Sequence, residues 1–373
     1  MTSTVRVELM TQQSTAESSV SESPEGSLSI VDCDVHPYMR DEDDLIPYLP
    51  DHLHSQGVFY PKGYWSSPIG VPREDARPDD GGPPGSDPEK VKDQLLDPFG
   101  IDYAILTGGG PNLAASVVPN AYYAGELTAA YNDWLIDEWL STDDRFLGCI
   151  SVATQNPERG AEEIHRLADH PQMVQVVAGS ASRIPLGQRN YWPLYEAAEE
   201  EGLPFAIHVG PEGRGITNPP SGAGYPNSYF ERHCVLPANF MGQLISMVLE
   251  GVFVEFPDLT FVMIEGGFGW VPHTMWRLDK NWKGLKEQTP WLEEPPSHYI
   301  RRNVRFTTQP IEEPERPEHL LQLFEMMHAE ETVMFASDYP HWDGDSPAHG
   351  LPNLPEELSN AIYYETARDL YGL

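Results

Sequence analysis

The chain has 373 residues and a formal net charge of −35, because 58 acidic residues face only 23 basic ones. Such a charge repels nucleic-acid phosphates and anionic membrane surfaces, which argues against both as partners. Hydrophobic residues make up 40% of the chain, enough to bury a large core, so one large α/β domain is expected rather than a disordered acidic protein.

The N-terminal segment and the cysteines bear on the domain boundaries and the cellular location. Residues 1–27 are rich in Ser, Thr and Glu and are predicted to be a disordered extension, with one folded domain over residues 28–373. Cys33, Cys149 and Cys234 have no paired spacing, which indicates a reducing, cytoplasmic location. The acidity would suit a protein that stays soluble in concentrated salt, although an ordinary acidic enzyme would look similar.

Short β-branched segments alternate with amphipathic helical segments, the pattern of a parallel sheet with crossover helices. An open doubly wound sheet is the alternative, but the first strand lacks the Gly-rich phosphate turn of that fold. Eight strand and helix repeats therefore predict a (β/α)8 TIM barrel. The predicted strands cover residues 29–35, 103–107, 146–153, 173–178, 205–209, 260–265, 304–308 and 332–337. The predicted helices cover residues 121–140, 158–168, 192–201, 240–251, 271–283, 318–327 and 356–370.

Three long connections interrupt this pattern, over residues 37–87, 210–238 and 287–299. The first two follow the first and fifth predicted strands, at the barrel face where active sites are assembled, so they are predicted to be active-site loops. The third follows a helix and is predicted to be a contact or assembly element.

Side chains that can bind a metal stand at the ends of three predicted strands. Strand alternation puts Asp34 and His36 on one side of the first strand, where they can chelate a divalent ion. His208 ends the fifth strand and Asp338 follows the eighth. Each has an ordinary alternative role, such as a hydrogen-bonded core histidine or a helix cap. Because these strand ends meet at one face of a barrel, the combination predicts a metal site.

Further polar residues lie close to the predicted ligands in the sequence. Arg214, Arg232 and His233 occur in the connection after the fifth strand and are predicted to bind a substrate carboxylate. His341 is predicted to contact the substrate or to orient a ligand. Residues 173–178 contain no lysine that could be carbamylated to bridge two ions, which favours one metal. A second ion, held by Glu265 with His233 or His341, is the alternative.

The sequence resembles the amidohydrolase-related metal enzymes, in particular the branch with aminocarboxymuconate semialdehyde decarboxylase and the resorcylate decarboxylases. The resemblance runs from about residue 30 to the C-terminus. It implies a TIM barrel with one catalytic divalent metal that activates water or orients a carboxylate-bearing substrate. It rests on VDCDVH at 31–36, AIH at 206–208, GVFVEFPDL at 251–259, IEGG at 264–267 with Trp270, and FASDYPH at 335–341.

Two departures from this family pattern bear on the chemistry. The family usually starts with His-x-His, whereas Asp34 takes the first position here, and a carboxylate favours the harder Mn or Fe over Zn. The family's proton-transfer histidine after the sixth strand is Glu265 in this chain. Glu265 can act as a general acid or base, or it can bind metal.

Four functions are compatible with these residues. The first is hydrolysis of a small organic acid or cyclic compound by a metal-activated water, with Asp338, Glu265 and His208 in catalytic roles. Metal-dependent decarboxylation of an aromatic or unsaturated acid is the main alternative, and hydrolysis is preferred only narrowly. Oxygenation at a dinuclear iron site ranks lower, and a catalytically silent binding protein ranks last. Family resemblance also implies self-association, as a dimer.

Overall fold

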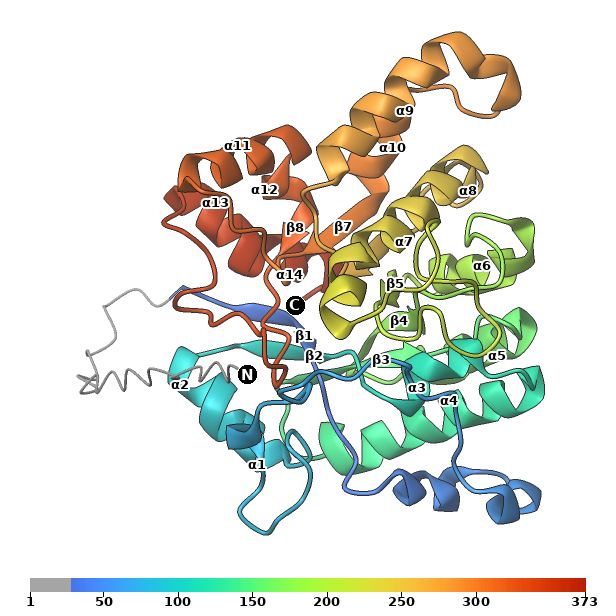
Figure 1. Ribbon diagram of the computed structural model, residues 1–373, viewed down its shortest axis with the longest axis vertical. Coiled ribbons are helices and arrows are strands. Elements are labelled where there is room, and N and C mark those ends of the chain that lie inside the picture. Colours follow the sequence, from blue (N-terminus) through green and yellow to red (C-terminus); the bar gives the residue numbers. More distant parts are fainter. Residues whose placement is uncertain (1–27) are drawn as a thin grey trace, which may run out of the picture.

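Eight parallel strands lie in one sheet whose order follows the chain from β1 to β8, as seen in the computed structural model of residues 28–373 (Figure 1). All eight strand predictions are confirmed, whereas the extension predicted for residues 1–27 falls outside the described part of the chain. The strands are β1 (Val31–Val35), β2 (Tyr103–Leu106), β3 (Phe146–Ser151), β4 (Met173–Gly179), β5 (Phe205–His208), β6 (Phe261–Ile264), β7 (Val304–Thr307) and β8 (Val333–Met334).

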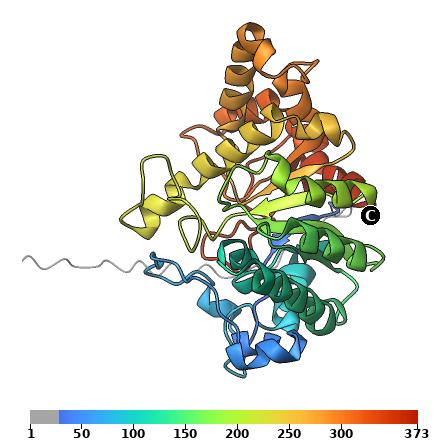
Figure 2. The same cartoon turned by 90° about the vertical axis from the view of Figure 1, so that its right-hand side faces the viewer.

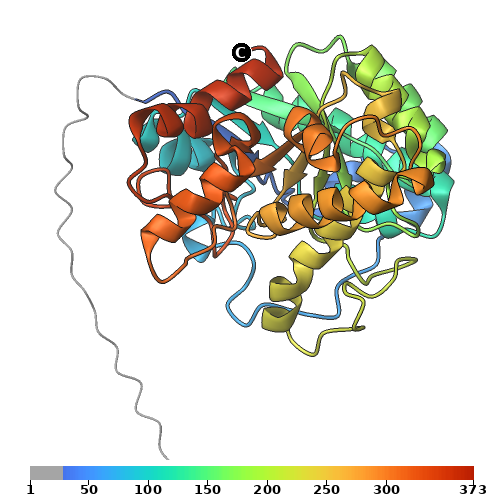
Figure 3. The ribbon, with the colours of Figure 1, turned by 90° about the horizontal axis from the view of Figure 1, so that it is seen from above.

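Helices connect successive strands and surround the sheet, which Figure 3 shows from above. The longer helices are α4 (Ala121–Leu135), α5 (Pro157–Leu167), α6 (Trp192–Glu200), α7 (Tyr229–Leu249), α9 (Val271–Leu285), α10 (Pro296–Asn303) and α11 (Pro317–Met327). The shorter ones are α1 (Pro88–Val91), α2 (Asp97–Phe99), α3 (Pro111–Ala114), α8 (Val252–Glu255), α12 (Ala329–Thr332), α13 (Glu356–Asn360) and α14 (Thr366–Tyr371). Among the described residues, no helix has the length and apolar character needed to cross a membrane.

The barrel is closed between its first strand and the segment that follows its last strand. β8 has only two residues, so regular pairing with β1 is replaced by individual backbone hydrogen bonds. The Asp338 amide donates to the Asp34 carbonyl at 3.0 Å, and the His36 amide donates to the Tyr339 carbonyl at 2.8 Å. The segments that carry the predicted metal ligands therefore form the seam of the barrel.

The core has two layers, in line with the alternation of side chains along each strand. Ala206 and Val262 belong to an inner apolar cluster, whereas their neighbours Phe205 and Phe261 belong to the larger cluster that includes the helices. Strand β1 departs from regular pairing, with a register shift between Asp32 and Val35. Such irregularities bend a strand and redirect its side chains, and this one lies where the predicted ligands begin.

The predicted boundaries of α7 and of the connection before it are wrong. The helix begins at Tyr229 rather than at residue 240, so the connection after β5 ends at Ser228. The Ser228 side chain caps the helix by accepting a hydrogen bond from the Glu231 amide at 3.1 Å. Pro237 lies inside the helix, although proline lacks the N–H donor that helix interiors use.

Two other predicted segments also differ from the structure. The third long connection contains helix α10 from Pro296 onward, where Ser297 is anchored by hydrogen bonds to Asp279 of α9. The last predicted helix is divided into α13 and α14 by a wider turn over residues 361–365. Helix α9 and the segment after it extend away from the body of the barrel (Figures 1 and 2).

Candidate metal centre

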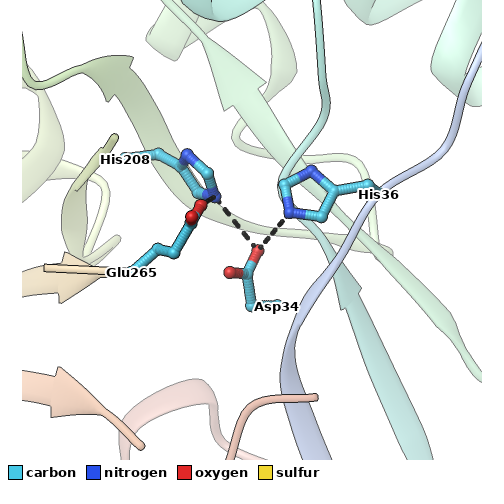
Figure 4. Close-up of side chains that lie close together, drawn as sticks. All are labelled: Asp34, His36, His208 and Glu265. Carbon is cyan, nitrogen blue, oxygen red and sulfur yellow. Dashed lines mark ion pairs between the residues drawn. The ribbon is translucent and has the colours of Figure 1, made fainter. Parts of the chain in front are cut away.

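Four ionisable side chains meet at the carboxyl end of the barrel strands (Figure 4). Asp34 ends the irregular part of β1, His36 follows that strand, His208 ends β5 and Glu265 follows β6. Each side chain offers one nitrogen or oxygen atom as a ligand, and these four atoms all lie within 4.8 Å of one another. All four side chains are buried, so the cluster is shielded from bulk water.

A second set of ligand atoms overlaps the first. It consists of His36, Glu265, Asp338 and His341, whose ligand atoms, one from each side chain, also lie within 4.8 Å of one another. Asp338 Oδ1 is 2.8 Å from His36 Nε2 and 2.7 Å from His341 Nδ1. The structure thus divides the four predicted ligands between two overlapping sets. Asp34 and His208 lie in the first, Asp338 lies in the second with His341, and His36 and Glu265 belong to both.

The two central histidines have the orientation of neutral metal ligands. His36 Nδ1 faces the carbonyl oxygen of Gly108, and His208 Nδ1 is 2.7 Å from the carbonyl oxygen of Val209. Because a carbonyl only accepts, each Nδ1 carries a proton and donates it, which leaves Nε2 as the ring nitrogen that faces the carboxylates and can bind a metal ion. Both Nε2 atoms lie 3.4 Å from Asp34 Oδ1. Either a proton or a metal ion on Nε2 would compensate the charge of this carboxylate.

Several buried atoms of the cluster have no hydrogen-bond partner among residues 28–373. They are Asp34 Oδ2, His208 Nε2 and Asp338 Oδ2. A buried polar atom without a partner costs about 1–3 kcal/mol, and more when it is charged. A divalent cation would satisfy all three, so the residues present fit a bound metal ion.

Electrostatics in the cluster reflect the crowding of three carboxylates. Burial raises the pKa of Glu265 well above its ordinary value, and the negative charge of Asp338 adds to this effect. Although burial lowers the pKa of His36, the carboxylates of Asp34 and Asp338 raise it to about 9. Burial also opposes ionisation of Asp338, yet His341 and His36 bring the pKa of this carboxyl below its usual range. The site therefore attracts positive charge.

Two residues of the cluster have a strained backbone. Glu265 has φ 57° and Asp338 has φ 59°, both in the left-handed region that non-glycine residues rarely adopt. Strain of this kind costs about 1–3 kcal/mol and occurs mostly at functional sites. Glu265 directly follows β6, and Asp338 lies four residues after β8. The strain supports a functional role for both carboxylates.

Thr107, directly after β2, supports the cluster and was missed by the sequence analysis. Its hydroxyl donates a hydrogen bond to Asp34 Oδ1. We expect Thr107→Val to weaken metal binding about 10- to 100-fold, because partners of ligating groups orient them and tune their basicity. Calorimetric titration of the metal-free variant with Mn²⁺ measures this change.

The matched control is Thr128→Val. The Thr128 hydroxyl is also buried but donates to the Gly125 carbonyl within α4 at 2.9 Å. This variant should bind Mn²⁺ like the wild type. Equal affinities in the two variants would contradict the role assigned to Thr107.

Of the four predicted substrate-binding residues, His341 belongs to the second set of ligand atoms, whereas Arg214, Arg232 and His233 lie outside both sets. Arg232 of α7 donates to the Gly210 carbonyl at 2.7 Å and to Glu212 Oε2 at 3.1 Å, so it holds the loop after β5. His233 is 3.2 Å from a carboxylate oxygen of Asp343. Arg214 makes no ion pair with the described residues, and burial lowers its pKa. A role of these residues toward a substrate stays a prediction.

The sequence analysis missed Tyr38, which contacts the cluster through His341. Its hydroxyl oxygen is 2.8 Å from His341 Nε2. Tyr38 lies two residues beyond His36, a spacing that puts both side chains on one side of an extended segment. The two-residue spacing from His36 is the feature of the sequence that could have identified Tyr38.

The barrel and the buried cluster together define the class of the molecule, an enzyme on the TIM-barrel fold with its site at the carboxyl ends of the strands. A family model described as amidohydrolase matches residues 31–373. The chain therefore belongs to the amidohydrolase family, as the motifs in the sequence indicated.

Similar proteins include aromatic acid decarboxylases. The gamma-resorcylate decarboxylase of Polaromonas sp. is 24% identical over 305 residues, which cover 75% of this chain and 86% of the relative. A solved dihydroxybenzoic acid decarboxylase from Polaromonas sp., with bound manganese and the inhibitor 2-nitroresorcinol, has a TM-score of 0.64 and 17% identity. The match covers 92% of this chain and 97% of that one.

A second solved structure is the 5-carboxyvanillate decarboxylase of Novosphingobium aromaticivorans, complexed with manganese and 4-hydroxy-3-methoxy-5-nitrobenzoic acid. Its TM-score is 0.66 at 20% identity, over 94% of this chain and 98% of that one. At these identities the likeness shows the fold, and the predicted TIM barrel is confirmed.

Proposed function

We propose that this protein is a metal-dependent, non-oxidative decarboxylase of an aromatic acid. The observation that carries the proposal is the buried cluster of histidines and carboxylates at the mouth of a barrel whose curated relatives include gamma-resorcylate decarboxylases. The sequence analysis ranked hydrolysis first and decarboxylation second, and the relatives favour the second. Hydrolysis remains the alternative to be tested.

Asp34, His36, His208 and Asp338 would hold the metal ion in this proposal. A bound divalent ion would supply a positive charge that holds the substrate carboxylate and a neighbouring oxygen. Two carboxylate ligands make the site hard, which favours manganese over zinc, and solved relatives contain manganese. His341 orients the Asp338 carboxylate through its Nδ1, and Tyr38 fixes the other ring nitrogen of His341.

Glu265 would handle the proton of the reaction. Its Oε2 lies 3.4 Å from His208 Nε2, and burial favours the protonated carboxyl. Glu265 donates this proton to the ring carbon that carries the carboxylate. The bond between ring and carboxylate then breaks, its electron pair restores the aromatic ring, and CO2 leaves. A proton from solvent returns to Glu265 and completes the cycle.

The test is turnover of hydroxylated aromatic acids by the manganese-loaded protein, with 2,6-dihydroxybenzoate and 5-carboxyvanillate as first substrates. We expect CO2 and the corresponding phenol in equal amounts, with one deuterium on the ring when the reaction runs in D2O. Hydrolysis of esters, amides or lactones without CO2 release would establish the alternative. Turnover that consumes oxygen would instead support an oxygenase.

We further infer that the partner of the protein is a small molecule and that the chain self-associates as a dimer. Trp276 of α9 is 58% exposed, and Trp291, between α9 and α10, is 37% exposed. Exposed aromatic side chains of this size are common in protein interfaces. Light scattering during gel filtration tests the dimer, and a monomer at micromolar concentration would contradict it.

A further inference from the structure

The left-handed turn at Glu265 needs support from other parts of the chain. Glu265 directly follows β6, and its φ of 57° lies in a region that non-glycine residues rarely adopt. Such a backbone persists only where its surroundings hold it in place. Gly267, with φ 62°, continues the same turn toward α9. The contacts of this turn therefore decide where the Glu265 carboxyl lies.

The first half of the turn is held by Thr307 and Trp270. The Glu265 amide donates to Thr307 Oγ1, at the end of β7, at 3.1 Å. The Trp270 indole N–H is shared between the carbonyl oxygens of Gly266 and Gly267, at 3.0 and 3.1 Å. Residues 265–267 are thus fixed to the end of β7 and to the residue that precedes α9.

The second half of the turn is held by Glu312, from the segment that follows β7. Glu312 Oε1 accepts hydrogen bonds from the amides of Phe268 at 3.0 Å and of Gly269 at 2.5 Å. Both amides precede α9, whose first residue is Val271, so no helical carbonyl is available to them. Hydrogen bonds to a carboxylate are roughly twice as strong as neutral ones, which makes Glu312 the main anchor of this half.

The absence of a side chain at Gly269 makes this contact possible. A Cβ atom at this position would lie 2.8 Å from Glu312 Oε1, closer than nonbonded atoms approach. The other carboxylate oxygen, Glu312 Oε2, is buried without a hydrogen-bond partner among residues 28–373. Burial of a carboxylate in this way destabilises a fold, which points to a role other than stability.

Thr307 and Glu312 lie five residues apart on one segment, which therefore holds the turn at both ends. We propose that Glu312 is a positioning residue for Glu265, because its carboxylate fixes the turn and thereby the place of the Glu265 carboxyl beside His208. The hold of Glu312 on the turn is independent of the reaction, whereas its effect on the rate rests on the proposed function.

The experiment compares Glu312→Ala with the wild type in amide exchange and in steady-state kinetics. Mass spectrometry of peptides that contain Phe268 and Gly269 should show exchange about 10- to 100-fold faster in the variant, because two amides lose a charged acceptor. The value of kcat should fall about 10- to 100-fold, since a displacement of about 1 Å can cost that much, with KM and bound manganese unchanged. Glu312→Gln should keep most of the wild-type rate, because its amide oxygen also accepts hydrogen bonds.

Two further variants separate positioning from a general loss of structure. In a Glu265→Gln background, Glu312→Ala should cause no further loss of kcat, because both changes act on the same step. Gly269→Ala should reproduce the loss with Glu312 present, since the added methyl displaces the carboxylate, and it replaces Glu312→Ala if that variant does not fold. The matched control is Gly284→Ala in α9, where an added Cβ meets no atom within 4 Å, and it should behave like the wild type.

Wild-type kcat or wild-type amide exchange in both Glu312→Ala and Gly269→Ala would overturn the proposal. So would a loss of manganese or a rise in KM that accounts for the whole effect, or an additional loss of kcat in the Glu265→Gln background. If exchange becomes faster but neither the wild type nor the variant decarboxylates a hydroxylated aromatic acid, the proposed function fails while the hold of Glu312 on the turn stands.

Discussion

Replacement of His208 by alanine is expected to remove the tightly bound metal ion and, with it, enzymatic activity. The His208 ring is buried, its Nδ1 is anchored on the Val209 carbonyl, and its Nε2 has no hydrogen-bond partner in the part of the chain that the structure describes. Loss of a group that merely supports a ligand costs about 10- to 100-fold in metal affinity, so loss of the ligand itself should cost more than about 100-fold. Plasma mass spectrometry on protein purified without chelators measures the metal content.

His233→Ala provides the comparison for this result. His233 lies in α7 and contacts Asp343, outside the cluster of ligand atoms, so this variant should keep its metal. A His208→Ala protein that retains the metal of the wild type would show that the ion binds elsewhere. Wild-type protein that stays free of metal after reconstitution would remove the basis of the proposed function.

Glu265→Gln should leave the bound metal ion in place and lower kcat about 100- to 10,000-fold. Glutamine has nearly the shape of glutamate but cannot release a proton, and proton transfer by a positioned side chain contributes about that factor. The relevant measurements are steady-state kinetics and metal content on the same sample. A smaller loss of rate with full metal content would assign proton transfer to another group.

Glu331→Gln is the control, because it makes the same replacement of Glu by Gln away from the metal cluster. Glu331 forms an exposed ion pair with Arg301 on the barrel surface. Exposed pairs contribute at most about 1 kcal/mol to stability, so the variant should fold and turn over like the wild type. A large effect of Glu331→Gln would mean that the loss in Glu265→Gln has a structural origin.

The sequence was most informative about the strands and the ligands that end them. Buried parallel strands need near-continuous apolar segments, which stand out in any sequence, and all eight were located. Asp34, His36 and His208 stand out for the same reason, since they are polar residues that end such segments. Topology then brings them together, because every strand of a barrel ends at the same face.

Features that depend on contacts between distant segments were not visible in the sequence. The helix around Pro237 starts early because packing and the Ser228 cap outweigh the local preference of proline. The left-handed backbone at Glu265 and Asp338 has no residue-type signal, since both positions would ordinarily favour glycine. The contact of Tyr38 with His341 joins residues 303 positions apart.

Because predicted ligands lie on both sides of the barrel seam, metal binding would affect the stability of the fold as well as activity. His36 and Asp338 stand 302 positions apart, on the two sides of the seam where β8 is too short to pair fully with β1. An ion bound by both would add a link across this seam to the backbone hydrogen bonds that already close the barrel. A ligand at a thousand times its dissociation constant stabilises a fold by about 4 kcal/mol. The supply of metal would thus govern how long the barrel stays closed and resists proteolysis, as well as how fast it turns over substrate.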